Sequence, residues 1–183
     1  AGEDAALRQL ESFCAEKVTA YKDMRDFPAA PGTSRLSAAF TVGALSHRQA
    51  VYAAEACAPQ GEGVTHWISE VIWREFYIHV LAAFPRVCKH RAFRLETERL
   101  TWNNDESQFQ AWCDGRTGIP IVDAGMRQLK RDGWMHNRIR MVTAMFLTKN
   151  LFIDWRRGES HFMRHLVDGF LASNNGGWQW SAG

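Results

Sequence analysis

Helical periodicity is the feature that most limits the folds open to this chain. Apolar residues recur at steps of three and four, as at Leu7, Leu10, Cys14, Val18 and Tyr21, and this spacing places them on one face of a helix. No stretch bounded by turn residues alternates apolar and polar side chains, as a half-buried strand would. The sequence therefore predicts an all-α fold, a packed array of about eight helices with no sheet of three or more strands.

Capping and turn residues set the limits of these helices. We expect helices over residues 7–21, 33–44, 47–56 with Ser46 as N-cap, 64–84 ending before Pro85, 106–112 capped by Asp105, 121–131, 136–149 and 159–167. Residues 86–104 are predicted to be mostly loop with short helix. Residues 174–180 are also predicted to be loop, because Asn and Gly begin that segment.

Composition and charge exclude several classes of protein. A hydrophobic fraction of 46% with a net charge of only +2 excludes an intrinsically disordered chain. Residues 116–165 nevertheless carry ten bases and four acids, which suits a phosphate-bearing partner. No signal-like segment opens the chain, and no apolar run is long enough to span a membrane. We expect a monomeric, cytoplasmic protein that does not bind membranes.

The four cysteines indicate neither a disulfide framework nor a zinc site. They are Cys14, Cys57, Cys88 and Cys113, widely separated and without a CxxC pair. His161 and His165 stand four residues apart, as two metal ligands on a helix could, but no third ligand is evident. We therefore predict reduced thiols and no metal. No Ser/His/Asp grouping or GxSxG motif indicates a nucleophilic enzyme.

Tryptophan is in excess, with eight residues beside three tyrosines. Because the indole N–H needs a partner when it is buried, Trp is a costly way to fill a core. The excess indicates either stacking on a flat ligand or chemistry of the indole itself.

Three segments could bind a ligand. Gly32–Ser37 offers three hydroxyls and one guanidinium at an expected helix N-terminus, a cradle for phosphate, although ordinary capping explains it better on sequence alone. In the 64–84 helix, an arc of roughly 120° carries Trp67, Glu70, Trp73, Arg74 and Tyr77. Ile72 and Phe76 lie opposite, so we expect this helix to be buried nearly all round.

The Glu70–Arg74 spacing has two interpretations, a weak surface pair or part of a ligand-lined cavity. The third segment is the 136–149 helix, where Asn137 and Met141 share a face and Arg138 can donate to a base or phosphate. Met141 could equally be a core residue. The basic residues near aromatic ones also allow a single-strand stacking site, which is a weak signal.

Three longer motifs carry a resemblance to a known family: Gly115–Leu129, Gly133–Met141 and Asn174–Trp180. With them the chain, from about Leu7 to Gly183, closely resembles the DNA photolyase/cryptochrome family, and within it the bacterial class I cyclobutane pyrimidine dimer photolyases (deoxyribodipyrimidine photo-lyases). The resemblance implies that residues 1–183 are a partial helical FAD-binding and lesion-binding domain. The family's N-terminal antenna domain, with its pigment, and its last helices would lie outside this chain.

The resemblance also implies which residues bind FAD. Positions matched to the phosphates, ribityl chain and cavity wall are Tyr21, Thr33, Ser34, Arg35, Leu36, Ser37, Trp67, Arg74, Trp134 and Arg140. Asp168 matches a carboxylate that pairs with the Arg140 position, followed by Gly169 and Phe170. Asn174 matches the residue that faces flavin N5. Phe170 departs from the family's usual second Asp, which contributes near the flavin pyrimidine edge.

The positions matched to damaged DNA are Arg25, Glu70, Trp73, Arg74, Tyr77, Asn137, Arg138, Met141 and Trp180. Glu70 is expected to be the hydrogen-bond partner of the dimer, and Glu70 and Asn174 are the expected catalytic residues. Trp102, Trp155 and Trp178 match the indoles that pass electrons to the flavin, with Trp178 nearest to it and Trp102 at the surface. This would explain the tryptophan excess.

The activity implied is that of a carbon–carbon lyase that splits pyrimidine dimers by electron transfer from light-excited, reduced FAD. Two alternatives remain from other classes: a cryptochrome-like flavoprotein that senses blue light, and a flavin-free helical DNA-binding module. Glu70 with Asn137 and Met141 favours repair over sensing.

Overall fold

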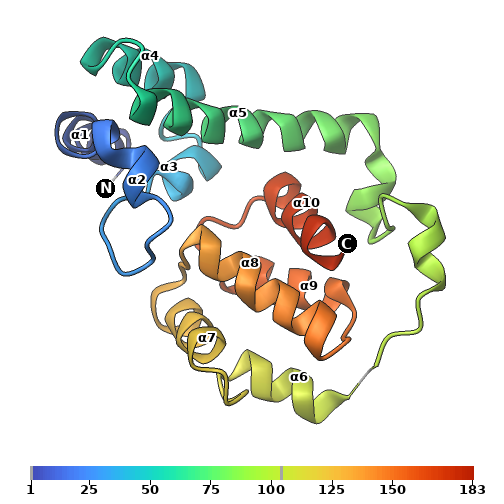
Figure 1. Ribbon diagram of the computed structural model, residues 1–183. Coiled ribbons are helices and arrows are strands. Elements are labelled where there is room, and N and C mark those ends of the chain that lie inside the picture. Colours follow the sequence, from blue (N-terminus) through green and yellow to red (C-terminus); the bar gives the residue numbers. More distant parts are fainter. Residues whose placement is uncertain (1, 104) are drawn as a thin grey trace. The chain divides into compact units, whose positions relative to one another are not determined.

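The computed structural model describes residues 2–103 and 105–183, and within these ranges it contains helices and no strand. The all-α prediction is confirmed. Figure 1 shows α1 (Glu3–Glu16), α2 (Tyr21–Met24), α3 (Ser37–Thr41), α4 (His47–Cys57), α5 (Glu62–Ala83), α6 (Glu106–Cys113), α7 (Pro120–Asp132), α8 (Asn137–Met145), α9 (Trp155–His165) and α10 (Leu171–Ala182). Short 3₁₀ segments η1 (Val18–Ala20), η2 (Pro85–Lys89) and η3 (Leu95–Arg99) connect some of them.

The chain divides into two compact units, residues 1–76 and 77–183, and the division falls within α5. In unit 1, α1 packs on α4, and the Phe13 ring lies 5.2 Å from that of Trp67. Gly63 brings the start of α5 against the backbone of η1, since a Cβ there would lie 2.1 Å from the carbonyl oxygen of Val18. The apolar faces of α1, α4 and α5 thus form the core of unit 1.

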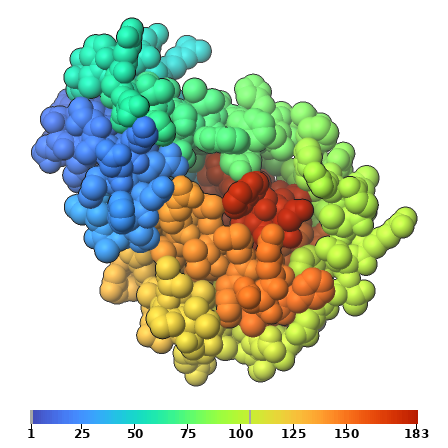
Figure 2. All heavy atoms as spheres, in the orientation of Figure 1, coloured from blue at the N-terminus to red at the C-terminus, as the bar shows by residue number. Residues whose placement is uncertain are grey.

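Unit 2 is organised around Trp112, which is fully buried in α6. Its indole N–H donates to the carbonyl of Thr143 at 3.1 Å, so burial leaves no indole donor unsatisfied. Helices α9 and α10 pack side by side, and their orange and red atoms adjoin in Figure 2. Gly158 permits this approach, because a Cβ there would lie 2.1 Å from the Trp178 ring.

Asp123 fixes the turn that precedes α7. Its buried carboxylate accepts hydrogen bonds from the backbone N–H and hydroxyl of Thr117, at 2.7 and 2.6 Å, and from the Gly118 N–H at 3.0 Å. Burial acts to raise the pKa of Asp123, but the hydrogen bonds from Thr117 and Gly118 outweigh it and the pKa is lowered. Within the motif Gly115–Leu129, Thr117, Gly118 and Asp123 therefore stabilise the turn that leads into α7.

Several predicted boundaries hold, including the Ser46 capping box before α4 and the Asp105 cap of α6. The helix expected over residues 7–21 instead stops at Glu16, because the chain tightens into η1 to bury Val18 completely. The helix expected over 33–44 is only α3, five residues long. In the described residues, no helix is long and apolar enough to cross a membrane.

The largest error concerns residues 174–180, which were expected to be loop and lie within α10. Asn and Gly disfavour helix locally, but tertiary packing overrides that preference here. Ala172, Asn175, Trp178 and Ser181 are buried along one side of the helix. Gly176 lets the Tyr77 ring approach, since a Cβ would lie 2.2 Å from it.

The helix predicted over residues 136–149 is α-helical only as far as Met145. After α8 the chain forms a π-helical turn, η4 (Phe146–Asn150). Leu147 and Thr148 are buried in this turn, whereas Lys149 and Asn150 are exposed. The Thr148 hydroxyl donates to the carbonyl of Ala144 at 2.9 Å, which helps to satisfy the widened backbone.

Candidate functional site

The predicted phosphate cradle is a loop rather than a helix N-terminus. Residues 33–36 precede α3, which is too short to supply a substantial dipole. Arg35 adopts a left-handed φ of 53°, and Gln9 donates from its side-chain amide to the Ser34 carbonyl at 2.7 Å. Leu36 is buried, so its side chain anchors the loop and only its backbone could serve a ligand. Thr33, Ser34 and Ser37 remain partly exposed.

Glu70 on α5 has Arg25 as its ion-pair partner. The Arg25 Nη1 lies 2.5 Å from Glu70 Oε1, and the two side chains are 20% and 32% exposed. Arg74, the partner considered from sequence, donates to the Thr41 hydroxyl at 3.1 Å. Arg25 and Glu70 were both predicted to contact damaged DNA, and unit 1 brings them together.

The expectation that this helix is buried nearly all round is wrong. Ile72, Trp73 and Phe76 are 60%, 52% and 47% exposed. The Trp73 and Phe76 rings contact each other edge to face, with centroids 5.3 Å apart. Trp67 is in the core, as is Tyr21, whose ring meets that of Phe13 edge to face. In this structure those two aromatic residues support unit 1, whereas Trp73 offers a ring to solvent.

Arg140 and Asp168, two of the predicted site residues, form an ion pair in which one guanidinium nitrogen contacts both carboxylate oxygens. The Arg140 Nη2 lies 3.0 and 2.8 Å from the two carboxylate oxygens, and its Nε donates to the Met135 carbonyl at 2.8 Å. The Asp168 side chain is 2% exposed. The pair ties α8 to the loop that contains Gly169 and leads through Phe170 into α10. The pairing that was expected between these two positions is present.

Glu159 is a buried residue that contacts the predicted site residue Asn174, and sequence reasoning did not single it out. It is 3% exposed on α9, and Asn174 donates from its side-chain amide to the Glu159 backbone carbonyl at 3.0 Å. Burial raises the pKa of Glu159, and hydrogen bonds from Asn174 and Asn175 oppose the shift in part. A lone Glu in a helical segment gives no signal of this role. It could have been found only by knowing that α10 is a helix that packs on α9.

The start of α8 gathers three residues predicted to touch DNA. Asn137 and Arg138 both direct side-chain N–H groups at the Met141 sulfur, at 3.8 and 3.9 Å. Asn137 is exposed, and the other two are partly exposed. The other two residues of unit 2 predicted to touch DNA differ in burial, since Tyr77 is partly buried and Trp180 is 60% exposed; Trp134, predicted to line the FAD cavity, is partly buried.

The three tryptophans of the predicted electron route all lie in unit 2. Trp155 and Trp178 are buried in one core cluster, and Trp102 packs against that cluster while remaining partly exposed. Trp102 stacks at a tilt on Phe152, with centroids 5.1 Å apart. Trp178 lies in α10 rather than in a loop, with its ring 6.0 Å from that of Trp112. The order of the three along an electron route remains a prediction.

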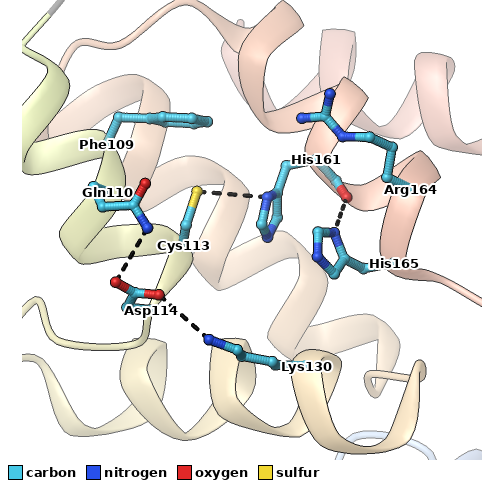
Figure 3. A pocket seen from close by; sticks show the side chains of 8 residues that line it. All are labelled: Phe109, Gln110, Cys113, Asp114, Lys130, His161, Arg164 and His165. Carbon is cyan, nitrogen blue, oxygen red and sulfur yellow. Dashed lines mark hydrogen bonds and ion pairs between the residues drawn. The ribbon is translucent and has the colours of Figure 1, made fainter.

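A pocket of about 270 Å³ in unit 2 is lined in part by Cys113, His161 and His165 (Figure 3). Cys113 lies 3.5 Å from His161 Nδ1, and the His161 and His165 rings stack. Burial raises the pKa of Cys113 to about 11 and lowers that of His161 to about 4. Both groups are therefore neutral near pH 7, which is unsuited to thiolate chemistry. The described residues also contain no metal-binding group of three His, Cys, Asp or Glu.

Comparison with known proteins identifies the family. The family model described as the FAD binding domain of DNA photolyase matches residues 67–183. Deoxyribodipyrimidine photo-lyase of Escherichia coli (strain K12) is 53% identical over 183 residues, covering 98% of this chain and 39% of the relative. That of Vibrio cholerae (serotype O1) is 54% identical over 177 residues, covering 95% of this chain and 38% of the relative.

Solved structures give the same result. A bacterial class III photolyase from Agrobacterium tumefaciens has a TM-score of 0.95 at 42% identity, covering all of this chain and 38% of that one. A cryptochrome from Synechocystis sp. PCC6803 has a TM-score of 0.91 at 34% identity, with 100% and 39% covered. The chain thus spans about two fifths of the length of the relatives that it matches. The resemblance noted from sequence and the expectation of FAD as the cofactor of the family are confirmed.

Proposed function

The chain belongs to the family of FAD-binding domains of DNA photolyase, and we propose that it binds FAD and acts in the light-driven splitting of cyclobutane pyrimidine dimers in DNA. The observation that carries this proposal is in unit 2. There α8 carries Arg140, which pairs with the buried Asp168 and is matched to the flavin, and the Asn137–Arg138–Met141 group, which is matched to the lesion. One short helix thus carries both kinds of contact.

The donor groups fit FAD. A pyrophosphate and a ribityl chain need hydroxyls, backbone N–H groups and a cation, and the loop of Thr33, Ser34 and Arg35 with Ser37 offers these types. The side-chain amide of Asn174 can donate and accept, as a contact with a flavin ring nitrogen requires. Phe170 offers no carboxylate at its position, so only its backbone could replace that contact.

Bound FAD, when reduced and excited by light, would supply the electron that splits the dimer. The residues of the chain then have separate tasks. Asn137 and Arg138 would donate hydrogen bonds to a flipped lesion or its phosphates, which offsets part of the cost of unstacking it. The Glu70 carboxylate would break its ion pair with Arg25, or keep it with one oxygen, in order to contact the dimer. The partial exposure of Glu70 permits this change of partner. The Glu159 carbonyl would orient Asn174.

A light-dependent repair assay on the full chain tests the proposal. Oligonucleotides that contain one thymine dimer should lose it under blue light with reduced FAD, and not in the dark. Glu70→Gln should lower the repair rate by roughly 100-fold to 1,000-fold, as does removal of one stabilising group at a reacting centre. Glu75→Gln, five residues further along α5, is the matched control and should keep the rate.

The outcomes discriminate among the alternatives. Bound flavin without loss of dimers in light would favour a cryptochrome-like sensor and contradict the repair proposal. DNA binding without flavin absorption in the purified protein would favour a helical DNA-binding module. The identity to relatives named photo-lyase supports repair more than either alternative.

A further inference from the structure

The pocket of about 270 Å³ in unit 2 is lined by several basic side chains (Figure 3). Lys130 of α7 and Arg164 of α9 are two permanent cations in its wall. His161 and His165, also on α9, line it with stacked rings. Among the described residues that line the pocket, Asp114 alone carries a carboxylate. Positive charge is therefore in excess, as a site for an anion requires.

The charge of Asp114 is already compensated by other groups. Its carboxylate lies 2.8 Å from Arg116 Nη2, and the side-chain amide of Gln110 donates to it at 3.1 Å. Lys130 Nζ lies farther away, at 3.5 Å. The Lys130 ammonium can therefore turn to another anion without leaving Asp114 unpaired.

The contact with Cys113 determines which nitrogen of His161 carries the proton. Burial, followed by the charges of His165 and Arg164, lowers the pKa of His161 to about 4. Burial raises the pKa of Cys113 to about 11. Near pH 7 the ring is thus neutral and the thiol protonated, so the thiol donates to His161 Nδ1 at 3.5 Å. The proton of His161 then lies on Nε2, which can donate to a ligand.

His165 adds a second imidazole beside the first. Its Nδ1 lies 2.8 Å from the carbonyl oxygen of His161, which can only accept, so this nitrogen carries a proton. The two rings stack with their centroids 4.2 Å apart. In the view of Figure 3, Lys130 lies below the two rings and Phe109 lies above them. The imidazoles and the Lys130 ammonium thus gather donor groups at one end of the pocket.

We propose that this pocket binds a small phosphomonoester, with the phosphate between Lys130 Nζ and the Nε2 atoms of His161 and His165. A phosphomonoester carries a charge of about −1.5 to −2 near pH 7, which matches the two permanent cations, Lys130 and Arg164. Its three terminal oxygens can accept hydrogen bonds from several donors at once. The site goes beyond the proposed function, since none of its lining residues was matched to the flavin or to the lesion.

The size of the pocket limits the ligand. Pockets that take drug-sized ligands measure about 300 Å³ or more, and this one is slightly smaller, at about 270 Å³. FAD is too large for it. Phe109 is only 9% exposed, and the Arg157 guanidinium lies 3.9 Å from the centroid of its ring, so little ring surface is left for an aromatic base. A non-aromatic ester of the size of glycerol 2-phosphate is therefore the suitable probe.

Isothermal titration calorimetry of the full chain with glycerol 2-phosphate, at pH 7 and constant ionic strength, tests the proposal. We expect binding at one site. Lys130→Met should weaken it by roughly 10-fold or more, because a hydrogen bond between charged groups is lost. Arg131→Met is the matched control, since it removes the same charge from the next residue of α7, which pairs with Asp132 instead. It should leave the affinity nearly unchanged.

Proton NMR of the histidine rings gives an independent measurement. The His161 signal is identified by its loss in His161→Gln. A bound anion favours the imidazolium form, so glycerol 2-phosphate should raise the pKa of His161 above about 4. Sodium acetate at the same ionic strength should neither move this titration nor produce heat of binding. Circular dichroism of each variant checks that its fold is retained.

Three results would overturn the proposal: no binding of glycerol 2-phosphate, equal weakening by Lys130→Met and Arg131→Met, and equal binding of acetate. A further comparison tests whether the phosphate belongs to nucleic acid. An oligonucleotide with a 5′-phosphate should bind no tighter than the same oligonucleotide with a 5′-hydroxyl. A gain from the 5′-phosphate that Lys130→Met removes would assign the pocket to a DNA end and contradict a free ester. None of these results depends on flavin binding or dimer repair, so failure here is distinguishable from failure of the proposed function.

Discussion

Each unit contains an arginine–carboxylate pair among the predicted site residues, and the two pairs differ in how far the carboxylate is exposed. In unit 2, Arg140 bridges both oxygens of Asp168; the Asp168 side chain is only 2% exposed, and the Arg140 side chain is 24% exposed. In unit 1, Arg25 meets one oxygen of Glu70, and both side chains are accessible to water, at 20% and 32%. A buried charge cannot lose its partner cheaply, whereas an accessible one can exchange it for water or a ligand.

This difference suggests that one pair holds the structure in place and that the other can exchange its partner for a ligand. The Arg140–Asp168 pair is suited to fix the loop before α10, next to residues matched to the flavin. The Arg25–Glu70 pair is suited to open, which is what a residue that contacts incoming DNA must do. The following four experiments test the contrast, from the largest expected effect to the smallest.

Breaking the buried pair should have the largest effect. Asp168→Ala leaves the Arg140 guanidinium, whose side chain is 24% exposed, without its main partner, so the free energy of unfolding should fall by about 1.5 to 3 kcal/mol. Urea denaturation followed by tryptophan fluorescence measures this. A fall of under about 1 kcal/mol would mean that the buried pair is no stronger than an exposed one.

Two adjacent glycines of α10 test whether unit 2 is also sterically tight. Gly176→Ala places a methyl group against the Tyr77 ring and should cost about 1 to 3 kcal/mol. Gly177→Ala is the matched control, because no atom lies within 4 Å of its Cβ position. It should stabilise by up to about 1 kcal/mol through helix propensity. Equal effects in thermal unfolding would contradict the close contact between Tyr77 and α10.

Glu159 tests the cost of a buried carboxylate in unit 2. Its pKa is raised in the folded chain, so the folded state keeps a proton that the unfolded state has lost. The free energy of unfolding should therefore fall as pH rises from the ordinary value of 4.5 through the raised pKa. Glu159→Gln should remove this decline and stabilise near pH 7 by on the order of 1 kcal/mol. Denaturation curves at several pH values measure it, and parallel profiles would argue against a raised pKa.

Breaking the exposed pair should have the smallest effect on stability. Arg25→Met keeps the aliphatic stem and removes the charge, with an expected cost under about 1 kcal/mol. Arg140→Met makes the same change in unit 2 and should cost about 3 kcal/mol or more, because it leaves Asp168 charged and buried. Equal losses in the free energy of unfolding, measured by urea denaturation, would contradict the proposed difference between the two pairs.

How much could be predicted from sequence depends on where the governing contacts lie. Local rules were sufficient for α4 and α6, since Ser46 and Asp105 cap them from the adjacent residue. They failed for α10, where the burial of Trp178 against α9 outweighs the poor helix propensity of Asn and Gly. Long-range packing also breaks the first predicted helix at Glu16.

The same distinction applies to the candidate site. The resemblance predicted the pairing of Arg140 with Asp168, and the structure contains it. No sequence rule indicated Glu159, because its role depends on α9 meeting α10. The 64–84 helix was predicted to be buried because its residues are apolar, and Trp73 shows that an apolar residue on a helix need not face a core.

The π turn of η4 has a consequence for how related chains can differ in length. Each residue advances an α-helix by about 100°, and a π turn accommodates one residue more than an α turn. Deleting one of the exposed residues Lys149 or Asn150 would therefore let the turn close as α-helix while Leu147 and Thr148 stay buried. Among homologues, loss of a single residue should therefore be tolerated at this turn, whereas longer insertions and deletions should accumulate in the exposed segments around η2 and η3.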